Sequence, residues 1–345
     1  MKKAIYIILG IIGLLAVGLY FFVSSGPYPS EAAEVAISKA LTVGVTPIED
    51  GETGFADNNG VKIWYEHIGA KDSSLGTILL VMGLNTTGIN FSEYFYQPLV
   101  DAGYDVIIYD NRDVGRSDWI EDWNKDNAYS LEDMAGDGFA ILDHLNIRQA
   151  HIVGVSMGGM IAQSMALNNP DRTLSLGSIM TSGYMMDPDI RPLDTRFEKI
   201  MIKVGVRYFV FPSEVNQMRF AMIVADAFKG KGDYKHNYDR IANRTLYELR
   251  DRKGFNPNGT KRHTAAIEAS GSRYEDLKKL QVPTIAIHGT TDPLVWPDHV
   301  KKYAPMIPNA EMLWIEGMGH DIPEKYAPEI VEGLIRNFKR GSERD

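Results

Sequence analysis

Hydrophobic residues gather in six short runs that are apolar at successive positions rather than at alternate ones. Longer segments with helix-forming or polar residues separate them. A strand that is apolar throughout is typical of a parallel sheet covered on both faces, because both rows of its side chains meet an apolar layer. The six runs are TILLVMG (residues 77–83), YDVIIYD (104–110), AHIVGV (150–155), LSLGSIMTS (174–182), PTIAIHG (283–289) and EMLWIEG (311–317).

An antiparallel hairpin is expected just before these runs. GFA at residues 54–56 and VKIWYEHIG at residues 61–69 flank the dipeptide Asn59-Gly60. Asn-Gly favours the two-residue turns that join antiparallel strands. Together with the six runs, the hairpin predicts an α/β fold with a mostly parallel sheet and helices on both of its faces.

The alternation of strands and helices is interrupted in residues 185–271. This stretch has no clear strand pattern and repeats apolar residues at helical spacing, as at Phe197 and Ile200. We expect a helical lid here, inserted between the two parts of an α/β core, residues 52–184 and 272–340. The methionine and aromatic residues of the lid either line an apolar pocket or form the lid's own core.

The N-terminal segment is long enough to cross a membrane. Residues 4–23 are 20 uncharged residues preceded by two lysines, and a helix of that length spans about 30 Å. We expect a transmembrane anchor within residues 1–25, with a cytoplasmic N-terminus and the rest of the chain in the periplasm or outside the cell. The alternative is a cleaved signal peptide and a secreted protein. Residues 26–51 are expected to form a linker with one helix-like patch at 31–41.

Composition and charge limit the possible partners, cofactors and catalytic groups. The 345 residues carry a net charge of −9, so we expect no nucleic-acid partner. There is no cysteine, which excludes disulfides, a cysteine nucleophile and thiolate metal sites. No HExxH motif or clustered ligand spacing occurs, so neither a metal nor a cofactor is expected. Residues 229–262 hold ten Lys and Arg against four Asp and Glu; these form local ion pairs or face anionic lipid headgroups.

Ser156 lies in Gly154-Val155-Ser156-Met157-Gly158, a GxSxG motif. The motif alone is common by chance in a glycine-rich chain. Here it directly follows the apolar run at 150–155 and precedes a helix-forming run at 157–167. A nucleophile elbow requires this strand–turn–helix context, because the sharp turn exposes the serine hydroxyl above the sheet. We therefore predict Ser156 as a nucleophile; the alternative is a glycine-rich strand end that packs closely against a helix.

A serine nucleophile needs a histidine base and an acid that orients it. Of the eight histidines, only His320 lies in a loop after the last predicted strand, in GMGHDIP. Asp292 lies three residues past the strand at 283–289, whereas Asp298 falls on the next helix and Asp321 is adjacent to the histidine. The sequence therefore predicts a triad of Ser156, Asp292 and His320, in the chain order serine, acid, histidine.

Acyl transfer also needs donors for a developing oxyanion. The backbone N–H of Met157, the residue after the nucleophile, is one candidate. The second is expected from the loop after the run at 77–83, where the sequence Met82-Gly83-Leu84 makes the N–H of Leu84 the candidate.

These features resemble the α/β-hydrolase superfamily over about residues 52–340, and within it the aclacinomycin methylesterase-like esterases. In that resemblance Asp110 and Arg112 are expected to brace a turn rather than to act in catalysis. The stretches that carry it are VMGL (81–84), YDNRDVGRSD (109–118), LEDMAGDGFAILDHLNI (131–147), AHIVGVSMGGMIAQ (150–163) and GMGHDIP (317–323).

The resemblance implies a serine hydrolase that cleaves carboxylic esters through an acyl-enzyme. Apolar acyl or lipid-like esters are the expected substrates, since the lid is rich in methionine and aromatic residues and a membrane segment precedes it. The same triad also serves acyltransferases, perhydrolases and aminopeptidases, which stay open as alternatives. A non-catalytic, membrane-tethered binding module is the alternative outside enzymes.

Overall fold

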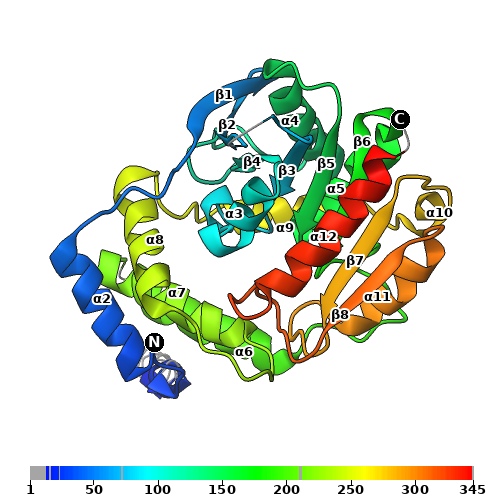
Figure 1. Ribbon diagram of the computed structural model, residues 1–345. Helices are drawn as coiled ribbons and strands as arrows, with labels where there is room; N and C mark the ends of the chain where they lie inside the picture. Colours follow the sequence, from blue (N-terminus) through cyan, green and yellow to red (C-terminus); the bar gives the residue numbers. More distant parts are fainter. Residues whose placement is uncertain (1–12, 15–16, 23, 71–72, 210–211, 344–345) are drawn as a thin grey trace. The chain divides into compact units, whose positions relative to one another are not determined.

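The computed structural model describes residues 13–14, 17–22, 24–70, 73–209 and 212–343. Its centre is an eight-stranded sheet with the strand order β1-β2-β4-β3-β5-β6-β7-β8 (Figure 1). β1 and β2 pair antiparallel, as do β2 and β4, and the remaining pairs are parallel. The strands are β1 (Glu52–Asn58), β2 (Val61–Ile68), β3 (Thr77–Val81), β4 (Asp105–Tyr109), β5 (Ala150–Val155), β6 (Thr173–Ile179), β7 (Thr284–Gly289) and β8 (Glu311–Ile315).

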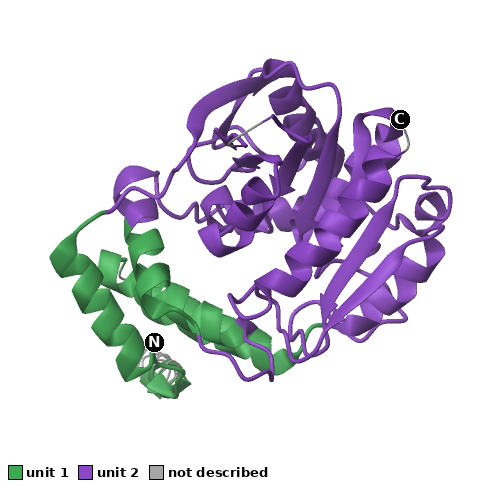
Figure 2. Ribbon diagram, in the orientation of Figure 1, with its two compact units in different colours: residues 1–45, 193–227, 236–246 green, residues 46–192, 228–235, 247–345 purple. Residues whose placement is uncertain are grey.

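The described α-helices alternate with the strands or belong to the inserted segment, except α2, which precedes β1. They are α2 (Glu31–Val43), α3 (Glu93–Asp101), α4 (Leu131–His144), α5 (Met157–Asn168), α6 (Thr195–Phe209), α7 (Glu214–Phe228), α8 (Tyr238–Asp251), α9 (Gly259–Ala269), α10 (Tyr274–Leu277), α11 (Pro297–Tyr303) and α12 (Ala327–Ser342). Figure 2 divides the chain into unit 1, residues 1–45, 193–227 and 236–246, and unit 2, which contains the whole sheet.

The six apolar runs become β3 to β8, and the predicted covering of both faces is confirmed. Along β3, Leu79 and Val81 pack in one hydrophobic cluster with residues of α4 and α5. Ile78 and Leu80 point the other way, into a cluster with residues of α3 and α12. A central strand such as β3 is therefore apolar along most of its length, because successive side chains enter different cores.

The predicted hairpin is also confirmed. β1 and β2 pair from Glu52 opposite His67 to Asn58 opposite Val61. Asn59 and Gly60 both have positive φ, 54° and 87°, which a two-residue turn of the primed type requires. The hairpin forms the antiparallel end of the sheet.

In unit 1 the helix-like patch of the expected linker is helix α2. Ser30 caps it by accepting a hydrogen bond from the Ala33 N–H, and one face buries Ala33, Ala36, Ile37 and Ala40. Arg219 of α7 holds Glu34 through two hydrogen bonds of 2.7 and 3.1 Å. The residues between the N-terminal segment and β1 are therefore built into a folded unit over the length of α2.

The expected anchor cannot be compared with the structure over most of its length. Residues 4–23 lie largely outside the described residues. Among the residues that are described, no helix is both long and apolar enough to cross a membrane.

Asp110 and Arg112 brace the turn after β4 through polar contacts, as the resemblance predicted. Asp110 accepts hydrogen bonds from the N–H groups of Gly88 and Arg116 at 2.8 and 2.9 Å. Arg112 forms a two-bonded ion pair with Asp137 of α4, at 2.6 and 2.8 Å. The turn is thereby tied both to the loop after β3 and to α4.

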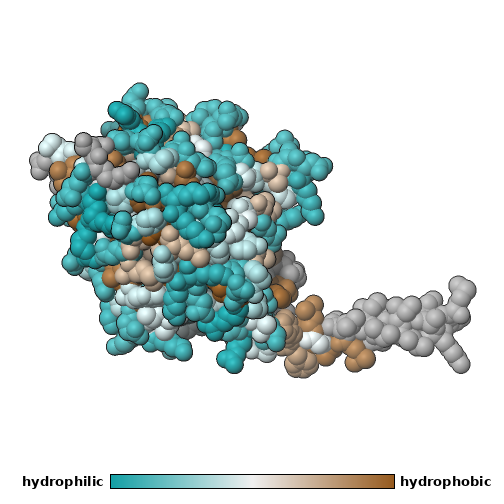
Figure 3. Space-filling view, turned by 90° about the vertical axis from the view of Figure 1, so that its right-hand side faces the viewer, coloured by the Kyte–Doolittle hydropathy of each residue, from teal (hydrophilic) through white to brown (hydrophobic). Residues whose placement is uncertain are grey.

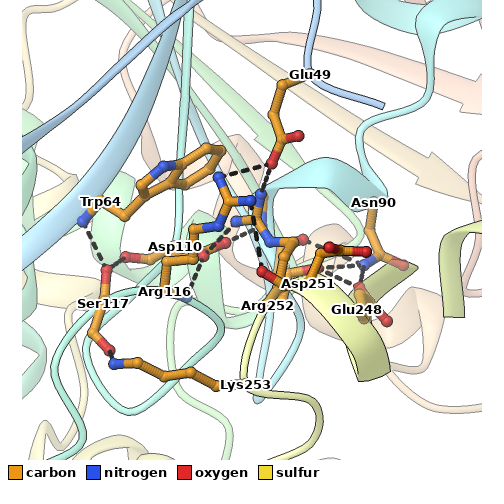
Figure 4. A network of polar contacts seen from close by, with 12 residues as sticks. Glu49, Trp64, Asn90, Asp110, Arg116, Ser117, Glu248, Asp251, Arg252 and Lys253 are labelled. Carbon is orange, nitrogen blue, oxygen red and sulfur yellow. Dashed lines mark hydrogen bonds and ion pairs between the residues drawn. The ribbon is translucent and has the colours of Figure 1, made fainter. Parts of the chain in front are cut away.

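Arg252 reaches the same turn from the segment after α8 (Figure 4). Its fully buried guanidinium pairs with Asp110 at 2.5 Å and with Glu49, and lies 3.9 Å from the centre of the Trp64 ring. Arg262 is likewise buried, against Asp113. Two arginines of the basic stretch at 229–262 are therefore buried in ion pairs with residues far away in the chain.

Replacing Arg252 by methionine should be strongly destabilising. The variant keeps most of the packing against Trp64 but leaves the buried Asp110 carboxylate without its cationic partner. Breaking a buried pair in this way costs about 3–5 kcal/mol. We expect a loss of that size in the free energy of unfolding, measured by urea denaturation.

Arg336→Met is the matched control, because Arg336 pairs with Glu311 at 2.6 Å but is 46% exposed. Its loss should stay below about 1 kcal/mol. The double variant Arg252→Met/Asp110→Asn should recover part of the stability. Equal losses in the two single variants would contradict a structural role for the buried pair.

Candidate active site

Ser156 occupies a sharp turn between β5 and α5. Its backbone has φ 57° and ψ −124°, a strained conformation that a non-glycine residue rarely adopts. The Ser156 N–H donates to the Ile179 carbonyl at 3.0 Å, and the Thr181 hydroxyl donates to the Ser156 carbonyl at 2.6 Å. β6 and the residues after it therefore hold the strained residue on both sides.

The flanking glycines of the motif are required by close backbone approach. A Cβ atom on Gly154 would lie 2.1 Å from the carbonyl oxygen of Gly158, and one on Gly158 would lie 2.1 Å from that of Val81. Any side chain at either position would force α5 away from β3 and β5. The structure thus gives the GxSxG spacing a steric cause.

Three side chains from distant parts of the chain meet at this turn. His320 Nε2 lies 3.0 Å from Ser156 Oγ, and His320 Nδ1 lies 2.8 Å from Asp292 Oδ2. The other carboxylate oxygen, Asp292 Oδ1, accepts hydrogen bonds from the N–H groups of Leu294 and Val295 at 2.8 and 2.9 Å. Because the carboxylate can only accept, Nδ1 carries the ring proton and Nε2 presents a lone pair to the serine.

The topology explains why these residues meet. Ser156, Asp292 and His320 follow the carboxyl ends of β5, β7 and β8, which are parallel strands of one sheet. Side chains that follow parallel strands gather at the same edge of the sheet. The arrangement can transfer a proton from the serine hydroxyl to the imidazole, as nucleophilic catalysis by serine requires.

The other buried histidines each have a polar partner of their own, although His288 Nε2 also lies 3.6 Å from Asp292 Oδ2. His151 lies 2.8 Å from the Ser175 hydroxyl, and His299 lies 2.8 Å from that of Ser182. Burial lowers the pKa of each to about 4. His288 lies 2.9 Å from the Val295 carbonyl, and burial lowers its pKa as well.

The rival acids are also engaged elsewhere. Asp298 lies on α11, as expected, where its carboxylate is half exposed and pairs with Lys301 at 3.4 Å. Asp321 accepts a hydrogen bond of 2.7 Å from the Tyr234 hydroxyl. Burial raises the pKa of Asp321 to about 6.

A short segment between α7 and α8 supports the histidine loop. The His320 N–H donates to the Phe228 carbonyl at 2.8 Å, and the two rings lie edge to face with centres 5.4 Å apart. The Gly232 N–H donates to the Gly317 carbonyl at 2.8 Å. Sequence reasoning missed this support, since a glycine-rich stretch 90 residues before the histidine carries no signal of pairing with it.

One candidate oxyanion donor, Met157, follows the serine in the chain, and the other, Leu84, follows a glycine that lies close to it. Met157 is the first residue of α5, so its N–H has no acceptor within the helix. Gly83 lies directly against the nucleophile, since a Cβ there would be 3.2 Å from the Ser156 Cβ. Leu84 follows it in the loop. Among the described residues, no group of His, Asp and Glu side chains is arranged to hold a metal ion.

Residues 76–325 match the protein family described as alpha/beta hydrolase fold. Among curated relatives, the rhodomycin D methylesterase of Streptomyces peucetius is 28% identical over 285 residues, which cover 79% of this chain and 93% of that protein. A bromoperoxidase structure from Bacillus anthracis superposes with a TM-score of 0.65 at 25% identity, over 84% of this chain and 100% of that one.

A further similar structure covers more of the chain. It is a membrane phospholipase A, titled a novel bacterial virulence factor, with a TM-score of 0.62 at 18% identity over 98% of this chain and 99% of that one. The family match extends over most of the sheet and includes all three side chains that meet at the elbow. The chain therefore belongs to the alpha/beta hydrolase fold family and, like the methylesterases it resembles, is a carboxylic ester hydrolase.

Proposed function

We propose that Ser156, His320 and Asp292 form the catalytic triad of this hydrolase. The observation that carries the proposal is the unbroken chain of contacts from Ser156 Oγ to His320 Nε2 and from His320 Nδ1 to Asp292 Oδ2, at 3.0 and 2.8 Å. Both lengths are those of hydrogen bonds. The buried Asp292 carboxylate fixes the tautomer that a general base needs.

In the proposed reaction, Ser156 Oγ forms a bond to the ester carbonyl carbon while its proton passes to His320 Nε2. The carbonyl π electrons move to the oxygen, which becomes an oxyanion facing the N–H groups of Met157 and Leu84. Collapse of the tetrahedral intermediate expels the alcohol, which takes the proton from His320. Water then attacks the acyl-enzyme by the same steps and releases the acid.

We further propose that the substrates are apolar acyl or lipid-like esters and that the N-terminal segment anchors the enzyme in a membrane. Residues 4–23 are uncharged, and the described residues among them expose apolar side chains, including Leu14 at 75% and Phe21 at 66%. Figure 3 shows hydrophobic atoms adjoining the grey ones. Large exposed apolar side chains in a row mark a surface that another phase or partner covers.

The similar membrane phospholipase A supports the same proposal, because its likeness covers 98% of this chain whereas the bromoperoxidase likeness covers 84%. A phospholipase A cleaves an acyl ester, which is the chemistry proposed for the triad. In the proposed orientation the N-terminus is cytoplasmic and the catalytic unit lies outside, in the periplasm or beyond the cell.

Ser156→Ala and His320→Ala should each lower kcat for a p-nitrophenyl ester at least about 10³-fold, because the triad residues act as one unit. The double variant should lose little more. Ser175→Ala is the control: its hydroxyl also contacts a buried histidine, His151, but at the opposite end of β5. A Ser156 variant that keeps wild-type turnover would show that the triad is wrongly assigned.

An apolar acyl site should favour longer acyl chains. Across a series of p-nitrophenyl esters from acetyl to hexanoyl, kcat/KM should rise, with each buried methylene contributing up to about 0.8 kcal/mol. The constant alcohol group isolates the acyl side. A flat or falling series would argue for a small acyl pocket instead.

The full-length protein should sediment with membranes and resist extraction by high salt and by carbonate, yet dissolve in detergent. Salt and carbonate release proteins held by surface charge, whereas a spanning helix stays buried in hydrocarbon. Mass spectrometry of the mature N-terminus distinguishes an uncleaved anchor from a cleaved signal peptide. An N-terminus beginning after residue 23 would establish cleavage and secretion, and overturn the anchor.

A further inference from the structure

The loop that carries the candidate donor Leu84 is held by three residues of the inserted segment. Asn85, the next residue, has a positive φ of 47°. Its N–H donates to His263 Nδ1 at 3.0 Å. Its side-chain amide donates to the Asn256 carbonyl and to the Thr260 hydroxyl, at 3.1 and 3.0 Å. The loop therefore turns sharply beside Ser156 and is held there by α9 and the residues just before it.

The hydrogen bonds of His263 define its protonation. Nδ1 faces the Asn85 N–H, which can only donate, so Nδ1 carries no proton. Nε2 lies 2.9 Å from the Arg112 carbonyl oxygen, which can only accept, so Nε2 carries the proton. The ring is completely buried, and burial lowers its pKa to about 4. His263 is thus a neutral acceptor for Asn85 at neutral pH.

His263 is itself held firmly in place. Its second partner, Arg112, is fixed by the ion pair with Asp137 on α4. Helix α9, which carries His263, approaches the loop so closely that a Cβ on Gly259 would lie 2.2 Å from the Asn85 side-chain oxygen. The His263 ring thereby spans from the braced turn after β4 to the loop after β3 and transmits the position of one to the other.

We propose that His263 is a positioning residue for ester hydrolysis: by accepting the Asn85 N–H, it turns the preceding N–H, that of Leu84, toward the oxyanion. The inference rests on the proposed function of Ser156 and of the two donors. The proposal also favours the Leu84 N–H over the Asn85 N–H as the oxyanion donor. The Asn85 N–H already donates to His263 and is not available to the substrate.

Two substitutions separate the two hydrogen bonds of the ring. In His263→Asn, the side-chain oxygen occupies the place of Nδ1 and still accepts the Asn85 N–H, whereas the contact with Arg112 is lost. In His263→Gln, the longer amide reaches the Arg112 carbonyl but leaves no acceptor at the Nδ1 position. A residue that merely packs the interior would respond to both changes alike.

We expect His263→Gln to lower kcat about 10- to 100-fold with KM within about threefold of wild type, since a misaimed donor acts mainly on the transition state. His263→Asn should stay within about threefold of wild type in kcat. The inhibition constant of an alkyl trifluoromethyl ketone should rise with the loss in kcat. Ser156 Oγ adds to its carbonyl carbon and passes its proton to His320, leaving an oxyanion that needs the same donors.

His151→Gln is the matched control, because His151 is also fully buried and has its pKa lowered to about 4. It lies near the start of β5, whereas Ser156 follows the end of that strand. We expect this variant to lower the melting temperature without changing kcat. Equal kcat in the Asn and Gln variants of His263 would overturn the inference, as would a loss that appears only in KM.

A measurement on the unaltered enzyme does not depend on whether the variants fold. The ¹⁵N chemical shifts of the His263 imidazole should show an unprotonated Nδ1 and a protonated Nε2 at pH 7. A proton on Nδ1 would overturn the inference. If Ser156→Ala retained turnover, the proposed function itself would fall; an inactive Ser156→Ala beside a fully active His263→Gln would remove the inference alone.

Discussion

A side chain on Gly158 would meet the Val81 carbonyl oxygen at 2.1 Å, so α5 reaches the end of β3 only because that position is glycine. This approach places the helix N-terminus, the end of β5 and the loop after β3 around one residue, Ser156. The positive φ of the serine follows from the same crowding. Strain of this kind persists only where the surrounding structure over-determines it, and here hydrogen bonds from the Ser156 N–H and to its carbonyl do so.

Buried ion pairs hold the turn after β4, which contacts the residues that position the loop after β3. Asp110, Arg112 and Asp113 lie almost side by side in the chain, and each pairs with a different distant segment. Removing charges from water is costly, so such pairs contribute more to a unique arrangement than to net stability. The turn in question also presents the Arg112 carbonyl to His263. A paired, immobile turn therefore underlies the loop that carries Leu84.

The sheet could be predicted from the sequence because a strand buried on both faces appears as a continuous run of apolar residues. A strand such as β3 is apolar at every position, and the hairpin turn needs Asn59-Gly60 for its two positive φ angles. The chain order of Ser156, Asp292 and His320, each after a predicted strand, likewise pointed to three residues that the structure brings into hydrogen-bonding distance. Their catalytic roles stay a prediction for the variants to test.

The rest could not be predicted because its partners are far apart in the chain. Asn85 and His263 are 178 residues apart, and Glu49 and Arg252 are 203 apart. Neither contact leaves a pattern in the residues next to it. The sequence indicated a helix near α2, at residues 31–41, but not its packing, since three of the four residues that α2 buries are alanines.

His320 and His263 illustrate how burial and hydrogen-bond partners can suit the same kind of side chain to opposite tasks. In the proposed mechanism His320 accepts a proton from Ser156, and its Nδ1 faces the Asp292 carboxylate, which would stabilise the imidazolium that forms. His263 has to remain an acceptor, and both of its ring nitrogens face neutral backbone groups in a dry interior. A proton on its Nδ1 would point at the Asn85 N–H and break the contact that holds the loop. In the proposed mechanism, an unprotonated Nδ1 is therefore what keeps the Leu84 N–H aimed at the oxyanion.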